Sequence, residues 1–309
     1  MDGQKVIDVP SRRYGNYRVR SRLGEGGMAE VFLAEAVDEL GEQIHVALKL
    51  MKKGVSDEMF NNEADLMGLL SHPNLVRRLE VGQAFGRPFI AMEFLIGGDL
   101  AEVMQVHRKE TKDFPTPMGV HIAVEVLKAL AYFHQARTRS GTPLNLVHGD
   151  VNPSNIFFSG HGDVKLGDFG VAKSRTANLG PMDGVTAGKL HYLSPEQTRG
   201  ETLTPASDLF AVGIMLHEMT VGYHPFQVRG GEASAVMAAI RAARLSLPDY
   251  VDKPLAKILR RALSPDLATR FNSAGEFAGQ LFHYALDHRL CPAPKDVQAW
   301  LEATLGLLN

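Results

Sequence analysis

The chain has 309 residues, of which 45% are apolar and 22% charged, an ordinary globular composition that suffices for one large domain or two lobes with their own cores. A net charge of −2 and a pI near 6.6 give no basic footprint for nucleic acid, and the one cysteine, Cys291, excludes an internal disulfide. No apolar run approaches the ~18 residues of a membrane span, and the polar N-terminus lacks the apolar core of a signal peptide. We therefore expect a soluble cytoplasmic protein, whole or part of a longer chain, with no nucleic acid among its partners and no membrane span.

The chain up to about residue 95 carries the pattern of an antiparallel β lobe. Apolar runs separated by glycines or polar stretches lie at 17–23, 31–34, 45–51, 75–82 and 89–94. Between the third and fourth runs, Ser56 followed by two acids begins a helical pattern that continues to Leu70, before His72-Pro73-Asn74. We expect a small antiparallel β lobe with one main helix.

After Gly97-Gly98 the pattern becomes helical. Residues 118–135 have helical periodicity, and residues 209–219 are apolar on nearly all sides, which predicts a helix buried inside a domain. Residues 254–309 predict further helices, interrupted at Pro265 and around Pro292–Pro294. The expected fold class is α+β, with a larger, mostly helical lobe after a glycine-marked hinge near residue 96.

A glycine-rich segment lies between the first two strands and contains Gly24, Glu25, Gly26 and Gly27. Glycines let a backbone turn tightly and bring its N–H groups close to a phosphate. Such a segment by itself is more often only the turn of a hairpin. It becomes informative only in combination with other phosphate-binding residues.

Lys49 ends an apolar strand, and Glu63 falls on the helix that follows it. A half-buried lysine needs an acidic partner, and an ammonium held by a carboxylate can be aimed at phosphates. Either residue alone is more often an ordinary surface position. The two together predict an ion pair.

Two later loops place acids directly after short apolar runs. Asp150 and Asn155 lie in the loop HGDVNPSN, and Asp168 lies in the segment LGDFG. Their hard oxygen atoms suit Mg²⁺, which binds with phosphates through one or two carboxylates plus water. As isolated turns both loops are ordinary, whereas their order after the glycine-rich segment, Lys49 and Glu63 predicts phosphate chemistry.

In this order the motifs resemble those of the protein kinase family, most closely the bacterial Ser/Thr kinases of the eukaryotic-like, or Hanks, type. The resemblance rests on LGEGGMAEVFLA, VALK, HPNLV, MEFLIGGDL, HGDVNPSN, GDFG, YLSPEQ, SDLFAVGIMLHEM and SPDLATRF. It implies a two-lobed protein kinase-like fold over residues 14–285, with a small lobe at 14–95 and a large lobe at 96–285. Residues 1–13 would be an N-terminal extension and residues 286–309 a C-terminal helical extension.

The resemblance also implies the activity and the ligands. ATP and Mg²⁺ would be the cofactors, and the γ-phosphate would pass to Ser/Thr hydroxyls of protein substrates. The protein would act in intracellular signalling, and a regulatory protein could be a further partner. Lys49 would hold the α- and β-phosphates and pair with Glu63. Asp150 would orient the substrate hydroxyl and accept its proton, while Asn155 and Asp168 would bind Mg²⁺.

Further roles follow from the same resemblance. The nucleotide would contact Gly24, Glu25, Gly26, Gly27, Val31, Ala47, Lys49, Met92, Glu93, Leu95 and Phe157, with Met92 as the gatekeeper and 93–95 as the hinge. Glu196 would pair with Arg270 to brace the large lobe. Asp208, at the start of the central helix, would anchor the catalytic loop.

The first departure from the family pattern is Gly149. Most members have Arg before the catalytic Asp, where it receives a phosphate on the activation loop. Without that Arg, a phosphate on Thr176 or Thr186 loses an important partner. We therefore expect activity that depends little on phosphorylation of these two threonines.

The second departure is Asn152, which stands where Ser/Thr kinases have the Lys that neutralises charge on the transferring phosphate. Lys189 occupies a position where the family usually has Thr, near the same Asp. We hypothesise that Lys189 supplies the missing cation beside Asp150 and count it among the catalytic residues. The alternative is that Lys189 faces solvent or substrate.

Two other functions compete with a protein kinase. Gly149 and Asn152 favour a nucleotide-binding pseudokinase or scaffold, whereas the complete set of base and metal residues favours an enzyme. The loop HGDVNPSN alone also suits a small-molecule phosphotransferase. Such enzymes generally lack the Ser-Pro-Glu segment and the helix that begins Ser-Asp-Leu-Phe, and both are present here.

The tail beyond the resemblance predicts one more helix. Its apolar residues have amphipathic spacing and are Val297, Trp300, Leu301, Thr304 and Leu305. We expect this helix to pack on the large lobe, and the alternative is a partner-binding helix.

Overall fold

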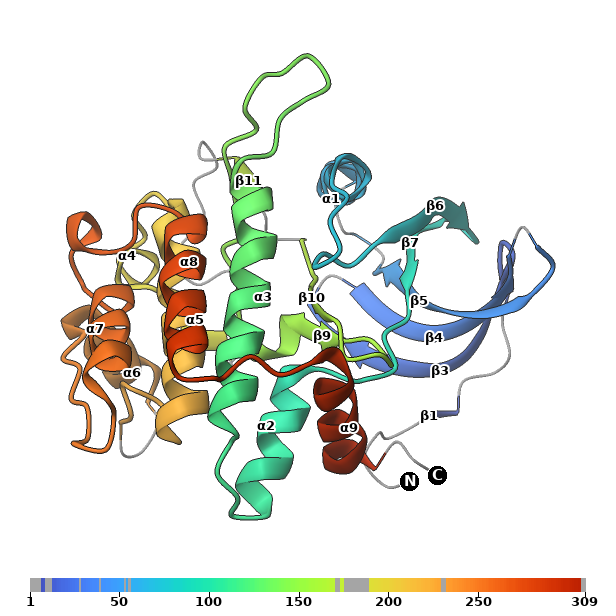
Figure 1. Ribbon diagram of the computed structural model, residues 1–309. Helices are drawn as coiled ribbons and strands as arrows, with labels where there is room; N and C mark the ends of the chain where they lie inside the picture. Colours follow the sequence, from blue (N-terminus) through green and yellow to red (C-terminus); the bar gives the residue numbers. More distant parts are fainter. Residues whose placement is uncertain are drawn as a thin grey trace. The chain divides into compact units, whose positions relative to one another are not determined.

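The computed structural model of the chain describes residues 7–8, 13–27, 29–38, 40–52, 54, 57–169, 173–174, 189–228 and 232–306. The chain divides into two compact units, residues 1–96 and 97–309 (Figure 1). Several residues used in the sequence analysis lie outside the described residues, namely Ser56, Gly170, Thr176 and Thr186.

The small unit is built on an antiparallel sheet with one helix beside it (Figure 1). Its strands are β1 (Ile7–Asp8), β2 (Arg13–Tyr14), β3 (Tyr17–Glu25), β4 (Ala29–Val37), β5 (Gln43–Met51), β6 (Arg78–Ala84) and β7 (Arg87–Glu93). They are ordered β1-β3-β4-β5-β7-β6, and β2 pairs with β3. The helix α1 (Asp57–Leu69) lies beside β6 and ends within one residue of its predicted limit.

Alternation along the central strands separates the two faces of this sheet. One face forms the buried core of the unit, with Tyr17, Val19, Phe32, Ala34, Val46, Leu48, Leu50, Phe89 and Ala91. The residues between them point to the opposite face. There Val31 is paired with Lys49 and Ala47 is paired with Met92. Four predicted nucleotide contacts therefore share one face of the sheet.

The large unit is mostly helical. Its helices are α2 (Leu100–Lys109), α3 (Thr116–His134), α4 (Pro195–Thr198), α5 (Pro205–Val221), α6 (Ala233–Ala242), α7 (Lys253–Ala262), α8 (Ala274–Asp287) and α9 (Pro294–Leu305). Helix α3 packs against both α5 and α8 (Figure 1). The expected combination of a β-rich part and a larger helical part is confirmed.

Short strands and single turns of 3₁₀ helix lie next to the loops of this unit. Strand β8 (Leu146–Val147) pairs with β11 (Lys173–Ser174), and β9 (Ile156–Phe158) pairs with β10 (Val164–Leu166). The turns are η1 (Pro153–Asn155), η2 (Lys189–Tyr192) and η3 (Leu267–Thr269). These elements bound the two loops that the sequence analysis singled out.

Helix α5 is the buried axis of the large unit, as its apolar sequence predicts. Every residue from Ser207 to His217 is buried. Gly213 allows α7 to approach closely, because a Cβ there would lie 2.9 Å from the Cβ of Ala262. Gly222 ends the helix in the left-handed conformation, with a φ of 91°.

Helices α2 and α6 are not anticipated by the sequence analysis. Both have ten residues and few buried side chains, three in α2 and two in α6, so each presents only a short amphipathic pattern. The start of α2 nevertheless carries a readable signal. Asp99 accepts a hydrogen bond from the backbone N–H of Glu102 at 2.9 Å, which is the Asp-x-x-Glu pattern of a capped helix.

The tail forms α9, which packs against α2 within the large unit (Figure 1). Val297 and Leu301 are buried. The ring of Trp300 lies 5.9 Å from that of His107, 5.3 Å from Phe114 and 6.4 Å from Phe158, between centroids. The indole N–H of Trp300 is buried without a hydrogen-bond partner among the described residues, so apolar contact dominates this docking.

Across the described part of the chain, no helix has both the length and the apolarity to cross a membrane.

Candidate active site

The loop His148–Asn155 is anchored to the first turn of α5. The carboxylate of Asp208 accepts the backbone N–H of His148 at 2.9 Å and that of Gly149 at 2.8 Å. A third contact joins Asp208 to the ring of His134 at 2.8 Å. Because α5 is buried, these bonds tie the loop to the least mobile part of the unit. Asp208 thus occupies the anchoring position that the resemblance assigns to it.

Gly149 has a backbone conformation that explains its identity. Its φ is 74°, in the left-handed region that residues with a Cβ rarely adopt. A Cβ at this position would also lie 3.3 Å from Cδ1 of Leu203. Any larger residue here, Arg included, would therefore meet both backbone strain and crowding.

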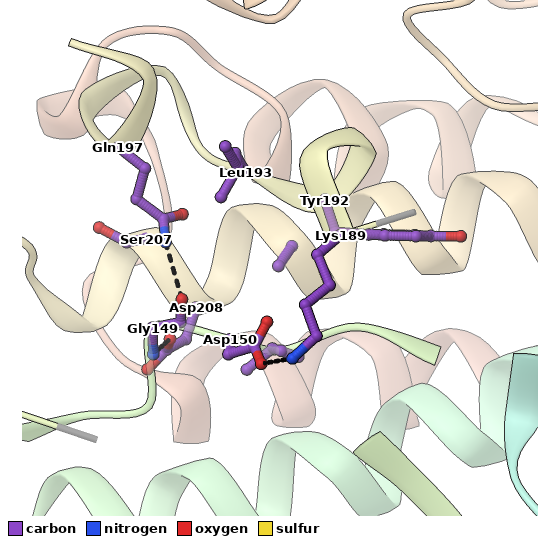
Figure 2. A pocket seen from close by; sticks show the side chains of 10 residues that line it. Gly149, Asp150, Lys189, Tyr192, Leu193, Gln197, Ser207 and Asp208 are labelled. Carbon is purple, nitrogen blue, oxygen red and sulfur yellow. Dashed lines mark hydrogen bonds and ion pairs between the residues drawn. The ribbon is translucent and has the colours of Figure 1, made fainter. Parts of the chain in front are cut away.

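The carboxylate of Asp150 receives three side-chain donors, of which Figure 2 shows Lys189. The amide of Asn152 donates to Oδ1 at 3.0 Å, and the amide of Asn155 donates to Oδ2 at 3.0 Å. The ammonium of Lys189, from the start of η2, forms an ion pair with Oδ2. The structure therefore brings Lys189 to Asp150.

Asn152 has a local role that the sequence analysis did not foresee. Its amide oxygen accepts the backbone N–H of Ser154 at 3.0 Å and so caps the turn η1. Its nitrogen also donates to the backbone oxygen of Asp150 at 2.9 Å. The side chain is 3% exposed, so it supports the loop from within.

A small open pocket lies in front of Asp150 (Figure 2). Its lining includes Gly149, Asp150, Lys189, Leu193, Gln197 and Asp208. A carboxylate and an ammonium thus face a space large enough for a small polar group. Such a pocket can hold a hydroxyl beside a proton acceptor and a cation.

Asp168 follows β10 in a strained backbone conformation, with a φ of 60°. The next residue, Phe169, is buried and stacks on Phe133 at 5.7 Å between centroids. The backbone N–H of Gly167 donates to the backbone oxygen of Asn155 at 2.9 Å. The segments that carry Asp168 and Asn155 are therefore joined directly.

In the small unit, Lys49 and Glu63 form the predicted ion pair. Nζ of Lys49 donates to Oε1 of Glu63 at 2.6 Å, and the side chains are 13% and 5% exposed. Since Glu63 belongs to α1, the pair joins this helix to β5. A pair this sheltered from solvent keeps most of its electrostatic strength.

The glycine-rich segment forms the turn between β3 and β4. Gly24 is paired with Val31, and the N–H of Gly26 donates to the backbone oxygen of Ala29 at 2.8 Å. The carboxylate of Glu25 bonds Lys52 at 2.7 Å, and that hydrogen bond lowers the pKa of Glu25. Gly27 has no non-neighbouring heavy atom within 4 Å of a virtual Cβ, so its backbone is open to a ligand.

The remaining predicted nucleotide contacts are half-buried. Met92 and Glu93 end β7, Leu95 follows it, and Phe157 lies in β9 of the large unit. The side chain of Glu93 accepts the backbone N–H of Arg77 at 2.8 Å, and the backbone N–H of Glu93 donates to the backbone oxygen of Arg77 at 3.0 Å. Within each unit, a predicted site residue therefore either has accessible surface or contacts another predicted site residue.

Glu196 and Arg270 form a bidentate ion pair at 2.8 and 3.0 Å, and both are 1% exposed. Burial raises the pKa of Glu196, but the hydrogen bonds and charge of Arg270 outweigh that effect and the pKa is lowered. The hydroxyl of Ser207 adds a bond of 2.7 Å. The predicted brace is present and links α4, α5 and the segment after η3.

One contact of the site escaped the sequence analysis altogether. The side-chain amide of Gln197 donates to the backbone oxygen of Gly149 at 2.8 Å (Figure 2). Gln197 also forms a capping box with Ser194. The box has the Ser-x-x-Gln pattern and is readable in the sequence, whereas the contact with Gly149 is not.

Comparisons with known proteins agree with this geometry. A family model described as protein kinase domain matches residues 17–288. The tyrosine-protein kinase MasK of Myxococcus xanthus is 32% identical over 95% of this chain and 46% of its own length. The probable serine/threonine-protein kinase PknB of Lactococcus lactis is 31% identical over 84% of this chain and 40% of its own. The serine/threonine-protein kinase PrkC of Bacillus subtilis is 30% identical over 88% of this chain and 41% of its own.

The chain thus spans less than half the length of these relatives. The limits expected for the domain and its two extensions stay a prediction. The match itself covers most of both units, from β3 to the end of α8. Fold, site and similarity together show that the chain belongs to the protein kinase family, among relatives of the bacterial Hanks type.

Proposed function

We propose that this chain transfers the γ-phosphate of ATP to Ser/Thr hydroxyls of protein substrates. The observation that carries the proposal is the carboxylate of Asp150, held by amide donors and paired with Lys189 at an open pocket. A scaffold protein has no need of a proton acceptor and a cation arranged around one accessible space. The family match extends through α8, which favours a protein substrate over a small molecule.

In this proposal Asp150 orients the acceptor hydroxyl and takes its proton as the new O–P bond forms, and ADP leaves with the electrons of the broken bond. Lys189 neutralises negative charge on the transferring phosphoryl group, the task that family members give to a Lys at the position of Asn152. Lys49 holds the α- and β-phosphates, and Glu63 fixes its direction. The face of the small sheet with Val31, Ala47 and Met92 receives the adenine.

The donor set of Asn155 and Asp168 fits Mg²⁺. The amide nitrogen of Asn155 is turned to Asp150, so the amide oxygen, the atom that a cation takes, is left for a ligand. Packing of Phe169 fixes the backbone next to Asp168. When bound, Mg²⁺ would neutralise phosphate charge and hold the phosphate in line with the acceptor.

The acceptor class rests on the relatives. Two of the three named above are serine/threonine kinases, and MasK is named a tyrosine kinase. The positions that normally separate the two classes are the unusual ones here, Asn152 and Lys189. Phosphoamino-acid analysis of the product therefore decides between Ser/Thr and Tyr.

The proposal is tested by autophosphorylation and by phosphorylation of a generic protein substrate with Mg·ATP. Wild type, Asp150→Asn and Lys49→Ala are compared, and the expected result is phosphoserine or phosphothreonine from wild type alone. Nucleotide binding without transfer would identify a pseudokinase. Transfer to small molecules but not to protein would identify a small-molecule phosphotransferase, and either outcome would overturn the proposal.

A further inference from the structure

The side chain of Gln197 joins the catalytic loop to α4. Its Nε2 donates to the backbone oxygen of Gly149 at 2.8 Å, and its Oε1 accepts the backbone N–H of Ser194 at 2.8 Å. Exchanging the amide nitrogen and oxygen would break both bonds, so the orientation of the amide is fixed by its partners. Gln197 therefore has one function toward its own helix turn and a second toward the loop.

The contact falls on a residue that is held on both sides. The N–H of Gly149 donates to Asp208 at 2.8 Å, and the oxygen of Gly149 accepts from Gln197. Gly149 has a left-handed φ of 74°, which glycine adopts without strain, so these two hydrogen bonds rather than a Cβ fix the direction of its peptide planes. The next residue is Asp150, whose backbone N–H bonds the ring of His148 at 3.3 Å, a long bond.

The end of α4 that carries Gln197 is itself rigid. Its neighbour Glu196 is held by Arg270 through two buried bonds. The guanidinium of Arg241 in α6 donates to the hydroxyl of Thr198 at 3.2 Å and to the backbone oxygen of Thr198. The residues on both sides of Gln197 are thus held by arginines, and the side chain of Gln197 extends from this segment to the catalytic loop.

We propose that Gln197 is a positioning residue for Asp150. It fixes the peptide between Gly149 and Asp150 to α4, and it does so with an uncharged amide. Most members of the family have an arginine at the position of Gly149, which takes a phosphate from the activation loop. Here the bond from Gln197 holds the loop directly, so the loop needs no phosphate to reach its working geometry. This inference rests on the proposed kinase activity.

Gln197→Glu separates the two functions of the side chain. Glutamate is an accepted residue at this place of a capping box, so the bond with Ser194 and the stability of the turn remain. Its ionised carboxylate cannot donate to Gly149 and repels the carbonyl oxygen there. Gln197→Met removes both bonds without adding charge. The matched control is Gln280→Glu, an equal change of charge on the exposed surface of α8.

The variants are compared with wild type after phosphatase treatment, by kcat, KM for ATP and thermal unfolding. We expect Gln197→Glu to keep its Tm and its KM for ATP while kcat falls about 10- to 100-fold, since small misplacements of a reacting group have effects of this size. Gln197→Met should lose kcat and also unfold at a lower temperature. Gln280→Glu should match wild type throughout.

The pH profile supplies a readout that a purely structural role would not change. When the introduced carboxyl group is protonated it becomes a donor again, so the ratio of the kcat of Gln197→Glu to that of wild type should rise as the pH falls through its pKa. A kcat within twofold of wild type at neutral pH would overturn the inference and leave the proposed function intact. Wild type without any phosphoryl transfer would overturn both.

Discussion

At the scale of single residues, two departures from the family pattern, Asn152 and Lys189, meet at the carboxylate of Asp150. Asn152 lacks the charge that its position usually supplies, and it is turned inward to cap η1. Lys189, from another segment of the chain, forms an ion pair with the carboxylate of Asp150. The charge that the family pattern places at position 152 is thus available from position 189.

Lys189→Met should lower kcat about 100- to 1,000-fold, the size of effect seen when one charge-stabilising group is lost from a phosphoryl or acyl transfer site. Lys189→Arg should retain much more activity because the charge remains. Steady-state kinetics with Mg·ATP and a protein substrate measure both. Unchanged turnover of Lys189→Met would show that its ammonium plays no part in the transfer.

Asn152→Lys should not rescue Lys189→Met, although it restores the residue that the family usually has. The side chain at 152 is 3% exposed and bonds Ser154 and Asp150, so a lysine there would lose the cap before reaching the pocket. The double variant is compared with Lys189→Met by kcat and by Tm. Full rescue would mean that the loop can rearrange and that the inward direction of Asn152 is incidental.

Motif order predicted Lys49, Glu63, Asp150, Asn155 and Asp168 because each lies in a short pattern with its own spacing. Lys189 could also be inferred, since a missing charge suggested where to look for a new one. The bond from Gln197 to Gly149 could not, because it joins residues 48 apart in the chain. Its geometry depends on how α4 is held by Arg270, which lies 74 residues from Glu196.

At the scale of elements, the long helices with many apolar residues were predicted well, and two of the shorter ones, α2 and α6, were not. The all-round apolar sequence of α5 and the long periodic run of α3 are unambiguous signals. In α2 and α6 a few buried side chains decide the packing, so tertiary contact determines these helices more than their pattern does. In α2 the capping residue Asp99 is a readable signal, whereas α6 begins without a side-chain cap.

Helix α5 also contains an acid-sensitive group, His217. Burial lowers its pKa to about 4, and its Nδ1 bonds the backbone oxygen of Tyr223 at 2.9 Å. In the unfolded chain this histidine binds a proton near pH 6.5, whereas in the folded chain it stays neutral until the pH approaches 4. The contribution of His217 to the free energy of unfolding is therefore complete above pH 6.5 and is lost as the pH falls toward 4. The pKa of the nearby His224 is lowered in the same direction, again by burial.

Lowering the pH from 7 to 5 should therefore reduce the free energy of unfolding by about 2 kcal/mol through His217 alone. His217→Gln cannot titrate, so this variant should show a smaller difference between the two pH values, even if its stability at pH 7 is lower. Urea unfolding at pH 7 and pH 5 measures the difference. An equal loss in wild type and variant would assign the acid sensitivity to other groups.

At the scale of the whole molecule, the chain consists of two units that each bury a core of their own. The composition predicted enough apolar residues for this division but not the partners within each core. The strand order of the small unit also goes beyond the sequence, because β6 and β7 join the sheet in the order β5-β7-β6. Pairing of this kind is decided by packing across the sheet rather than along the chain.

A ligand that binds only the folded chain should stabilise it by mass action. At 100 times its dissociation constant, Mg·ADP should add about 2.7 kcal/mol to the free energy of unfolding. Lys49→Met should lose most of this gain because the charge held by Glu63 is absent. Thermal unfolding with and without nucleotide tests this, and equal stabilisation of both proteins would remove Lys49 from the list of phosphate contacts.

The docking of α9 has a practical consequence for spectroscopy. Trp300 is the only tryptophan of the chain, and its ring lies against His107, Phe114 and Phe158. Selectively excited indole fluorescence therefore reports on the site where α9 packs on the large unit, whereas circular dichroism reports on all helices. If α9 detaches before the rest unfolds, the emission will shift to longer wavelength at a lower urea concentration than the loss of ellipticity. The natural sequence thus contains a fluorophore at the attachment point of its C-terminal helix.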